Sequence, residues 1–292
     1  MPAAPADRRF VLTLSCPDRP GLVAGVATFL ASFDGWILEA AHHSDAVTGR
    51  FFMRQEVRAD SVPFGLTELR GRFAEVAAKF EMTWAIHDTA EPPRTVFLCS
   101  KQDHCIVDLL HRWRTNDLPC ELVAVVSNHD DLRSFVEWHD VPYHHIPVPP
   151  GSREDKQPAF DAVRKLCREL DADTLVLARY MQIVPPDFCD AWPNRILNIH
   201  HSFLPSFVGG KPYHQAYDRG VKLVGATCHY VTPDLDAGPI IEQDVVRVNH
   251  ADTVDDMVRR GRDVERRVLA TGVRLHLEHR VLVHGNKTVV FP

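Results

Sequence analysis

Two consecutive prolines, Pro92 and Pro93, separate two stretches of this 292-residue chain that differ in hydrophobic pattern. Proline fixes φ and has no backbone N–H to donate, so a pair of prolines interrupts any helix or central strand that reaches it. Alternating strands and amphipathic helices precede the pair, and short continuous apolar runs follow it. We therefore predict two domains, residues 1–91 and residues 92–292, each long enough to bury a core.

The first domain is predicted to follow the order βαββαβ. A strand at 10–15 ends at a Pro-Gly break that opens a helix to about Phe33; a hairpin over 36–45 and 51–58, a helix over 65–79 and a strand over 82–87 follow. This order gives a small antiparallel sheet with two helices on one face, the ferredoxin-like arrangement.

The second domain alternates short apolar strands with helical stretches, which predicts a Rossmann-like α/β fold with a largely parallel sheet. Strands are expected at 95–100, 121–127, 174–178 and 195–200. The end of the chain differs: 222–231 and 240–246 are expected to be antiparallel, and 280–284 and 287–291 flank a Gly-Asn turn.

Charge and cysteine content narrow the class of protein. The formal net charge is −6, which provides no global basic field for nucleic acid or an anionic membrane. The seven cysteines form no Cys-x-x-Cys pair, a pattern that favours reduced thiols. The N-terminus lacks the apolar core of a signal peptide, and no apolar run reaches membrane-spanning length. We expect a cytoplasmic protein without nucleic-acid or membrane partners.

Candidate catalytic groups lie where a strand of the parallel sheet ends. Asn198 and His200 share one face of the strand over 195–200, because strand side chains repeat every two residues. The turn-rich loop 232–239 carries two carboxylates, Asp234 and Asp236, and could bring an acid to this pair. An amide, an imidazole and a carboxylate suit attack of water or an amine on a carbonyl, although each type also occurs in structural roles at strand ends and turns.

Metal and cofactor motifs are missing from the sequence. The 17 histidines include neighbouring pairs, such as His144-His145, whose members face opposite ways on a strand, and no His-Glu-x-x-His occurs. No glycine-rich phosphate loop follows the first strand of the second domain, and Gly209-Gly210-Lys211 is interpreted as a flexible turn. We expect neither a metal nor a cofactor.

The motifs around these residues resemble the folate-dependent formyltransferase superfamily, whose signature is an Asn-x-His strand end and a distant Asp-x-Gly loop. Over its whole length the chain is most similar to the formyltetrahydrofolate deformylase family. The stretches that carry the resemblance are 125–129, 177–183, 198–205, 212–217 and 285–291, and Gly209-Gly210 departs from the Gly-Ala often found there.

This resemblance implies a function and a set of site residues. The implied reaction is hydrolysis of 10-formyltetrahydrofolate to tetrahydrofolate and formate, which would supply formate for purine synthesis and balance one-carbon folate pools. Asn198 and His200 would stabilise the oxyanion, and Asp236 would orient His200 and help to deprotonate water. Backbone groups would hold the pterin in a substrate-binding loop formed by Arg179, Tyr180, Met181, Gln182 and Ile183.

The stretches 16–23 and 49–54 of the first domain resemble those of an ACT domain, which implies a regulatory or assembly role. Its loop of Asp18, Arg19, Pro20 and Gly21 opens a helix and could bind the carboxylate of an amino-acid effector, such as glycine or methionine. Because ACT domains pair, we expect a homo-oligomer, either a dimer or a tetramer.

Two other functions stay open. A formyltransferase would use the same Asn198, His200 and Asp236 with an amine acceptor. The loop after the first strand of the second domain reads Lys101-Gln102-Asp103-His104, without the glycines that would anchor a ribosyl phosphate, and this favours water over a purine precursor. A non-catalytic amino-acid sensor is the other alternative.

Overall fold

The computed structural model describes residues 8–206 and 212–292, and the chain forms two compact units. The first unit contains the chain up to Pro92 together with His279–His284 and Val289–Pro292. The second unit contains Pro93–Glu278 and Gly285–Thr288. The change of unit at Pro92 agrees with the break seen in the sequence. The two C-terminal segments were expected in the second domain, but they pack with the first.

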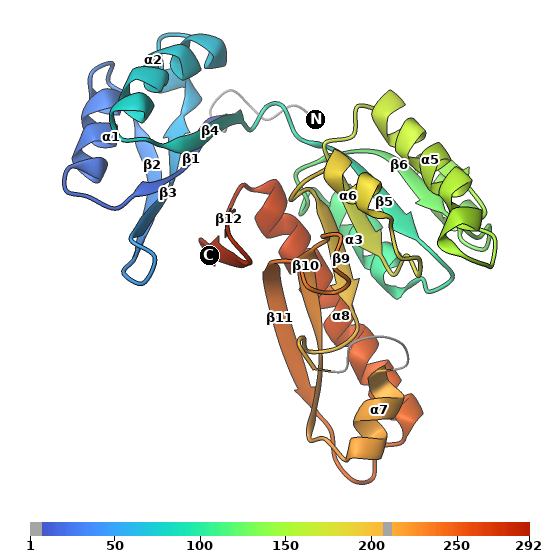
Figure 1. Ribbon diagram of the computed structural model, residues 1–292. Coiled ribbons are helices and arrows are strands. Elements are labelled where there is room, and N and C mark those ends of the chain that lie inside the picture. Colours follow the sequence, from blue (N-terminus) through green and yellow to red (C-terminus); the bar gives the residue numbers. More distant parts are fainter. Residues whose placement is uncertain (1–7, 207–211) are drawn as a thin grey trace. The chain divides into compact units, whose positions relative to one another are not determined.

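The first unit has the predicted βαββαβ order (Figure 1). Its elements are β1 (Arg9–Pro17), α1 (Leu22–Ala31), β2 (Ile37–Asp45), β3 (Arg50–Arg58), a short 3-10 turn (Ala59–Ser61), α2 (Leu66–Lys79) and β4 (Thr83–Asp88). The strands pair antiparallel in the order β2-β3-β1-β4. Val26 of α1 and Phe73 of α2 are fully buried against Leu14 of β1, so both helices cover one face of the sheet.

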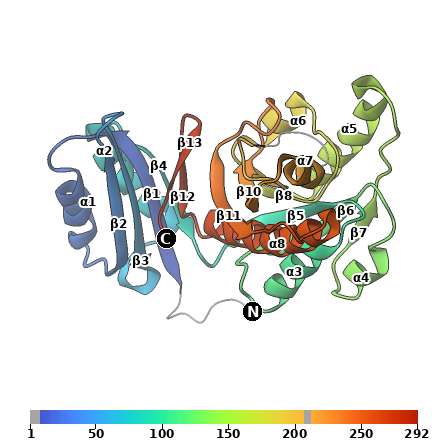
Figure 2. The ribbon, with the colours of Figure 1, turned by 90° about the horizontal axis from the view of Figure 1, so that it is seen from below.

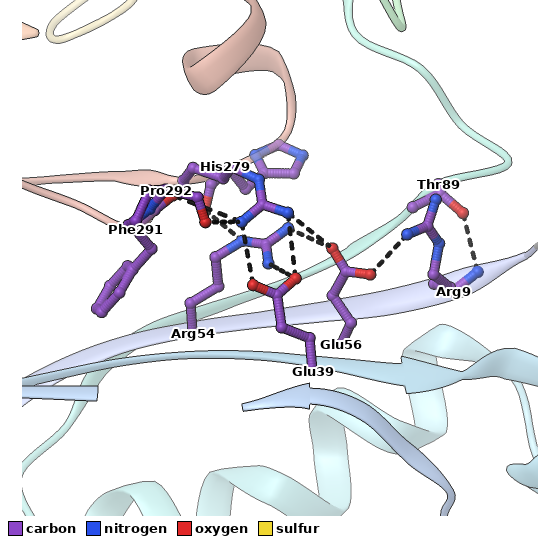
Figure 3. A network of polar contacts seen from close by, with 9 residues as sticks. Arg9, Glu39, Arg54, Glu56, Thr89, His279, Phe291 and Pro292 are labelled. Atoms are coloured by element: carbon purple, nitrogen blue, oxygen red, sulfur yellow. Dashed lines mark hydrogen bonds and ion pairs between the residues drawn. The ribbon is translucent and has the colours of Figure 1, made fainter. Parts of the chain in front are cut away.

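The other face of this sheet carries a buried polar network with the C-terminal segments (Figure 3). Side chains alternate along β3, so Arg54 and Glu56 point away from the helix-covered core. The Arg54 side chain is 1% exposed and donates to Glu56 at 2.6 Å, to Glu39 at 3.1 Å and to the carbonyl of His279 at 3.2 Å. Arg280 donates to Glu39 at 3.1 Å. Strand β3 is therefore buried on both faces.

The second unit is built on a seven-stranded sheet in the order β11-β10-β9-β8-β5-β6-β7. Its strands are β5 (Arg94–Cys99), β6 (Glu121–Ser127), β7 (Tyr143–His145), β8 (Thr174–Ala178), β9 (Ile196–His200), β10 (Leu223–Tyr230) and β11 (Ile240–Arg247). The strands from β9 to β7 are parallel, while β10 and β11 are antiparallel to their neighbours. The predicted Rossmann-like fold is confirmed. The three-residue strand β7 was not predicted from the sequence.

Helices cover both faces of this sheet. They are α3 (His104–Arg114), α4 (Arg133–Glu137), α5 (Arg153–Glu169), α6 (Pro186–Ala191), α7 (Pro212–Arg219) and α8 (Val254–Leu277). Figure 2 shows α3 and α8 on one side of the sheet and α5 and α6 on the other. The chain ends with β12 (Val281–His284) and β13 (Lys287–Val290), the hairpin predicted from the Gly-Asn turn.

The strand order locates the expected ligand crevice. From β5 the chain moves outward through β6 and β7 and then returns to β8 on the other side of β5. Ligands of parallel α/β sheets bind beyond the carboxyl ends of the strands where the order reverses in this way. Within the described ranges, no helix has both the length and the apolar character to cross a bilayer.

Candidate active site

A cavity of about 310 Å³ opens at the carboxyl ends of β8 and β9. Three segments line it: the loop after β8, the end of β9, and the loop between β10 and β11. The predicted site residues that line it are Arg179, Tyr180, Met181, Gln182, Ile183, Asn198, His200 and Asp236. The structure thus brings the proposed catalytic residues and the proposed folate loop to one cavity.

Strand pairing adds a histidine that the sequence analysis did not single out. Asn198 on β9 lies opposite His229 on the antiparallel strand β10. The Asn198 Nδ2 atom is 3.2 Å from Nε2 of His229, which is only 2% exposed. The signal available in the sequence was a histidine within a late apolar strand, but only the register between the strands shows that it meets Asn198.

The carboxylate of Asp236 lies between two imidazoles. Its Oδ2 atom is 3.2 Å from Nδ1 of His200, and its Oδ1 atom is 3.9 Å from Nε2 of His229. The side chains of Asp236 and His200 are 9% and 6% exposed. This arrangement confirms the expectation that the loop after β10 brings an acid to the strand end, and Asp234 does not line the cavity.

The backbone of this loop explains why a glycine follows Asp236. Asp236 has a φ of 55°, in the left-handed region that Asp tolerates better than most residues. At Gly238 a Cβ atom would lie 1.8 Å from the carbonyl oxygen of Tyr230, so any larger residue would displace the loop from β10. Gly238 therefore lets the loop lie close enough for Asp236 to reach His200.

The hydrogen bonds define the protonation states of the site. Burial lowers the pKa of His229, so its imidazole is neutral. Its Nδ1–H donates to the carbonyl of Tyr230 at 2.9 Å, which leaves Nε2 to accept from the amide of Asn198. Burial opposes ionisation of Asp236, but the hydrogen bond and charge of His200 outweigh it and hold its pKa below the usual value. The site thus combines a carboxylate with a neutral imidazole.

One nitrogen of His200 is available for chemistry. Its Nδ1 faces Asp236, and its buried Nε2 has no hydrogen-bond partner among the described residues. Buried polar atoms almost always have a partner, so an unpaired nitrogen in a cavity is suited to a bound reactant. The neighbouring His201 is different, because burial and the charge of Arg179 lower its pKa to about 4 and keep it neutral.

The loop after β8 is fixed to the neighbouring strand. Ser100, directly after β5, accepts from the backbone N–H of Met181 at 2.9 Å and donates to Asn128 at 2.7 Å. The N–H of Gln182 donates to the carbonyl of Tyr180 at 2.8 Å. Two of the loop amides are therefore engaged within the protein, and a pterin would have to use other backbone groups of the loop.

The side chains of this loop take three directions. Met181 and Ile183 are 51% and 70% exposed, large apolar groups available to a ligand at the cavity. Tyr180 packs into the core of the second unit. Arg179 extends from the loop to Glu265 on α8, with its Nε 3.4 Å from that carboxylate.

One group of side chains has the composition of a metal site. His104, Cys105 and Glu265 place three potential ligand atoms within 4.8 Å of one another. However, the Glu265 oxygens already accept hydrogen bonds from His104 and Tyr213, and burial raises the pKa of the Cys105 thiol well above its usual value. This arrangement is a hydrogen-bonded cluster rather than a set of free ligands.

The candidate effector loop lies at the start of α1. Pro20 and Gly21 line a groove between α1 and α2, but Asp18 and Arg19 do not. The Arg19 guanidinium donates to the carbonyl of Lys79 at 3.0 Å, and the Asp18 N–H donates to Gly49 at 2.8 Å. The Gly209-Gly210-Lys211 turn lies outside the described residues.

Comparisons with known proteins identify relatives of this chain. The formyl transferase family model matches residues 93–273. A formyltetrahydrofolate deformylase of Synechocystis sp. is 48% identical over 280 residues, which are 96% of this chain and 97% of that protein. The crystal structure of a formyltetrahydrofolate deformylase from Pseudomonas syringae pv. tomato superposes with a TM-score of 0.95 at 60% identity, covering 98% of this chain and 95% of that chain.

A more distant solved structure resembles only part of the chain. Glycinamide ribonucleotide transformylase 1 of Symbiobacterium toebii superposes with a TM-score of 0.64 at 32% identity. The match covers 95% of that protein but 69% of this chain.

Proposed function

This chain belongs to the formyltetrahydrofolate deformylase family, and we propose that it hydrolyses 10-formyltetrahydrofolate to tetrahydrofolate and formate. The observation that carries the proposal is the single cavity in which Asn198, the His200–Asp236 pair and the loop after β8 meet. Folate is a substrate in this reaction, and we propose no separate cofactor.

The proposed reaction consumes one water molecule. The water oxygen attacks the formyl carbon, and the oxygen of the formyl group becomes an oxyanion. The C–N10 bond then breaks, N10 takes a proton, and formate leaves. A proton must leave the attacking water and another must reach N10, so the site needs an acid–base group beside the carbonyl.

The residues divide these tasks by their chemistry. The Asn198 amide is a donor suited to the oxyanion, and the bond to His229 fixes its orientation. His200 lines the cavity, and its Nε2 atom has no hydrogen-bond partner among the described residues, while Asp236 holds Nδ1. Because the Asp236 carboxylate and the His200 imidazole lie 3.2 Å apart, we assign the proton from water to the pair rather than to one residue.

The test is formate release from 10-formyltetrahydrofolate in buffer without any amine. A deformylase releases formate and tetrahydrofolate in equal amounts under these conditions. A formyltransferase would leave the substrate intact until an acceptor is added, and an amino-acid sensor would bind ligand without turnover. Either of these results would overturn the proposal.

We also propose that the first unit is an ACT domain that binds an amino acid, either glycine or methionine, and assembles the enzyme as a dimer or tetramer in the cytoplasm. Its βαββαβ order and the groove beside Gly21 support this assignment. The test is to measure the molecular mass of the protein in solution and its rate of formate release, with and without each amino acid. A monomer whose rate responds to neither amino acid would contradict it.

A further inference from the structure

The loop after β8 begins at a residue with an unusual backbone conformation. Arg179 directly follows β8, lines the cavity and has a φ of 62°. Glycine adopts this left-handed region readily, whereas a residue with a Cβ atom is strained in it. Strained residues concentrate at functional sites. An arginine at this position is explained if its side chain has a task that glycine cannot perform.

The side chain of Arg179 lies against a carboxylate from another element. Its Nε atom is 3.4 Å from Oε2 of Glu265 on α8, and the two side chains are 10% and 1% exposed. The same Oε2 atom is 2.8 Å from Nε2 of His104 on α3, and Oε1 accepts from the Tyr213 hydroxyl of α7 at 2.7 Å. One buried carboxylate thus joins the start of the loop to three helices of the second unit.

The contact between Arg179 and Glu265 is a buried ion pair. Burial opposes ionisation of Glu265, but the hydrogen bond from His104 and the charges of Arg179 and His104 hold its pKa below the usual value. The guanidinium of an arginine stays protonated in proteins. Ion pairs removed from water often contribute little net stability compared with apolar residues of the same volume. Stability alone is therefore a weak reason for placing these charges here.

Glu265 is the main restraint on the Arg179 side chain. Among the described residues, no other carboxylate lies within 4.0 Å of this guanidinium, and its Nη1 atom has no hydrogen-bond partner. If the Glu265 carboxylate loses its charge, nothing else printed by the fold at this place compensates the guanidinium. The side chain would then have to move toward water, and the strained backbone at Arg179 would be free to follow it.

The rest of the loop has its own fixed points. The backbone N–H of Met181 donates to Ser100 at 2.9 Å, and Tyr180 is buried in the core of the second unit. All five residues of the loop, 179–183, line the cavity. A shift of Arg179 therefore displaces one end of a cavity surface whose other contacts stay in place.

We propose that Glu265 is a positioning residue for the deformylase reaction: it holds the Arg179 side chain and thereby fixes the loop after β8 for folate binding. The inference rests on the proposed function and adds a residue to it that does not itself line the cavity. Because the loop is assigned to folate and not to the reacting carbonyl, its displacement weakens binding of substrate and transition state alike. Such a loss raises KM and leaves kcat almost unchanged.

The experiment is a double-mutant cycle in the full-length protein with Glu265→Gln, Arg179→Met and the double variant. Glutamine keeps the shape of the side chain and can still accept from Tyr213, but it lacks the charge that holds Arg179. Tyr213→Phe is the matched control, because it removes one hydrogen bond from Glu265 and leaves the contact with Arg179. Formate release gives KM and kcat, anaerobic titration calorimetry gives the Kd of tetrahydrofolate, and urea unfolding shows that each variant is folded.

We expect Glu265→Gln to raise KM and the Kd of tetrahydrofolate by about tenfold and to change kcat by less than about twofold, on the scale of coupling between residues in contact. In the Arg179→Met background the same change should raise neither constant further, because no guanidinium is left to hold. Tyr213→Phe should keep the KM and the Kd of the parent protein.

Three results overturn the inference: an unchanged Kd in folded Glu265→Gln, an equal rise in the Arg179→Met background, or an equal rise in Tyr213→Phe. If Glu265→Gln does not fold, Glu265→Asp takes its place in the cycle, since it keeps the charge but withdraws it from Arg179. A parent protein that releases no formate without an amine contradicts the proposed function instead, and the Kd values of the cycle still decide whether Glu265 acts through Arg179.

Discussion

The polar network of the first unit and the candidate catalytic pocket of the second differ in how fully their groups are paired. In the network of Figure 3, the Arg54 guanidinium donates to two carboxylates and a carbonyl. In the pocket, His200 uses one ring nitrogen and leaves the other without a partner among the described residues. Arg54 and the Nε2 atom of His200 are both buried, so an unpaired polar atom at either place has a cost. From this difference we infer that the paired groups stabilise the fold, and we propose that the unpaired nitrogen of His200 interacts with a reactant.

The comparison is tested most strongly at Asp236. The Asp236→Asn change keeps the shape of the side chain but removes the charge that supports His200, so turnover should fall by roughly 10² to 10⁴-fold. Folate binding should change little, because the loop after β8 is unaltered. Formate release and folate affinity are measured together. Near-normal turnover would remove Asp236 from the mechanism.

At Arg54 we expect the opposite result, a loss of stability without a loss of turnover. The Arg54→Met change leaves buried carboxylates with fewer partners, so the free energy of unfolding should fall by about 3 to 5 kcal/mol. Turnover per folded molecule should not change. Urea unfolding measures the first quantity and formate release below the transition measures the second. The control is Arg72→Met, which removes an exposed pair with Glu68 and should cost less than about 1 kcal/mol. If Arg54→Met and Arg72→Met lose the same free energy of unfolding, the buried network around Arg54 contributes no more stability than an exposed ion pair.

Substitution of Asn198 distinguishes a role in catalysis from a role in substrate binding. If its amide donates to the oxyanion, Asn198→Ala should lower kcat by roughly 10² to 10³-fold and leave KM nearly unchanged. Steady-state kinetics give both constants. A raised KM at constant kcat would instead make Asn198 a binding residue.

The smallest expected effect is on stability in acid. Burial lowers the pKa of His87 in the first unit and of His201 in the second from 6.5 to about 4. Between pH 6.5 and 4 the unfolded chain binds protons at these residues and the folded chain does not, so stability falls as the pH is lowered through this window. Replacing His87 by Phe should reduce this loss of stability, measured by urea unfolding at several pH values. An unchanged pH dependence would mean that His87 is protonated in the folded state.

Local patterns were enough to predict most of the fold. The alternation in 10–15 and 51–58, the helical spacing in 65–79 and the apolar run in 174–178 all correspond to observed elements, because their side chains face a core whose geometry repeats with the same period. The Asn198 and His200 pairing on one face was predicted for the same reason. Strand β7 was not predicted, since three residues are too few to show a period.

The features that the sequence did not reveal depend on contacts between distant segments. His229 meets Asn198 through strand register, and Glu265 meets Arg179 across 86 residues of chain. Arg54 donates a hydrogen bond to the carbonyl of His279, which lies 225 positions later in the chain. Each residue type also has ordinary surface or core roles, so a single sequence gives no local signal for such partners.

The two C-terminal segments have a consequence for synthesis on the ribosome. The sheet of the first unit emerges early, but the residues that cover its second face follow Pro92 by almost two hundred positions. At about 5 to 20 residues per second, that face stays uncovered for at least about 10 s. An apolar surface exposed for so long would invite aggregation, whereas Arg54, Glu56 and Glu39 are groups that water solvates well until His279 and Arg280 arrive. The charges on this face thus suit a nascent domain that must wait for the last residues of its own chain.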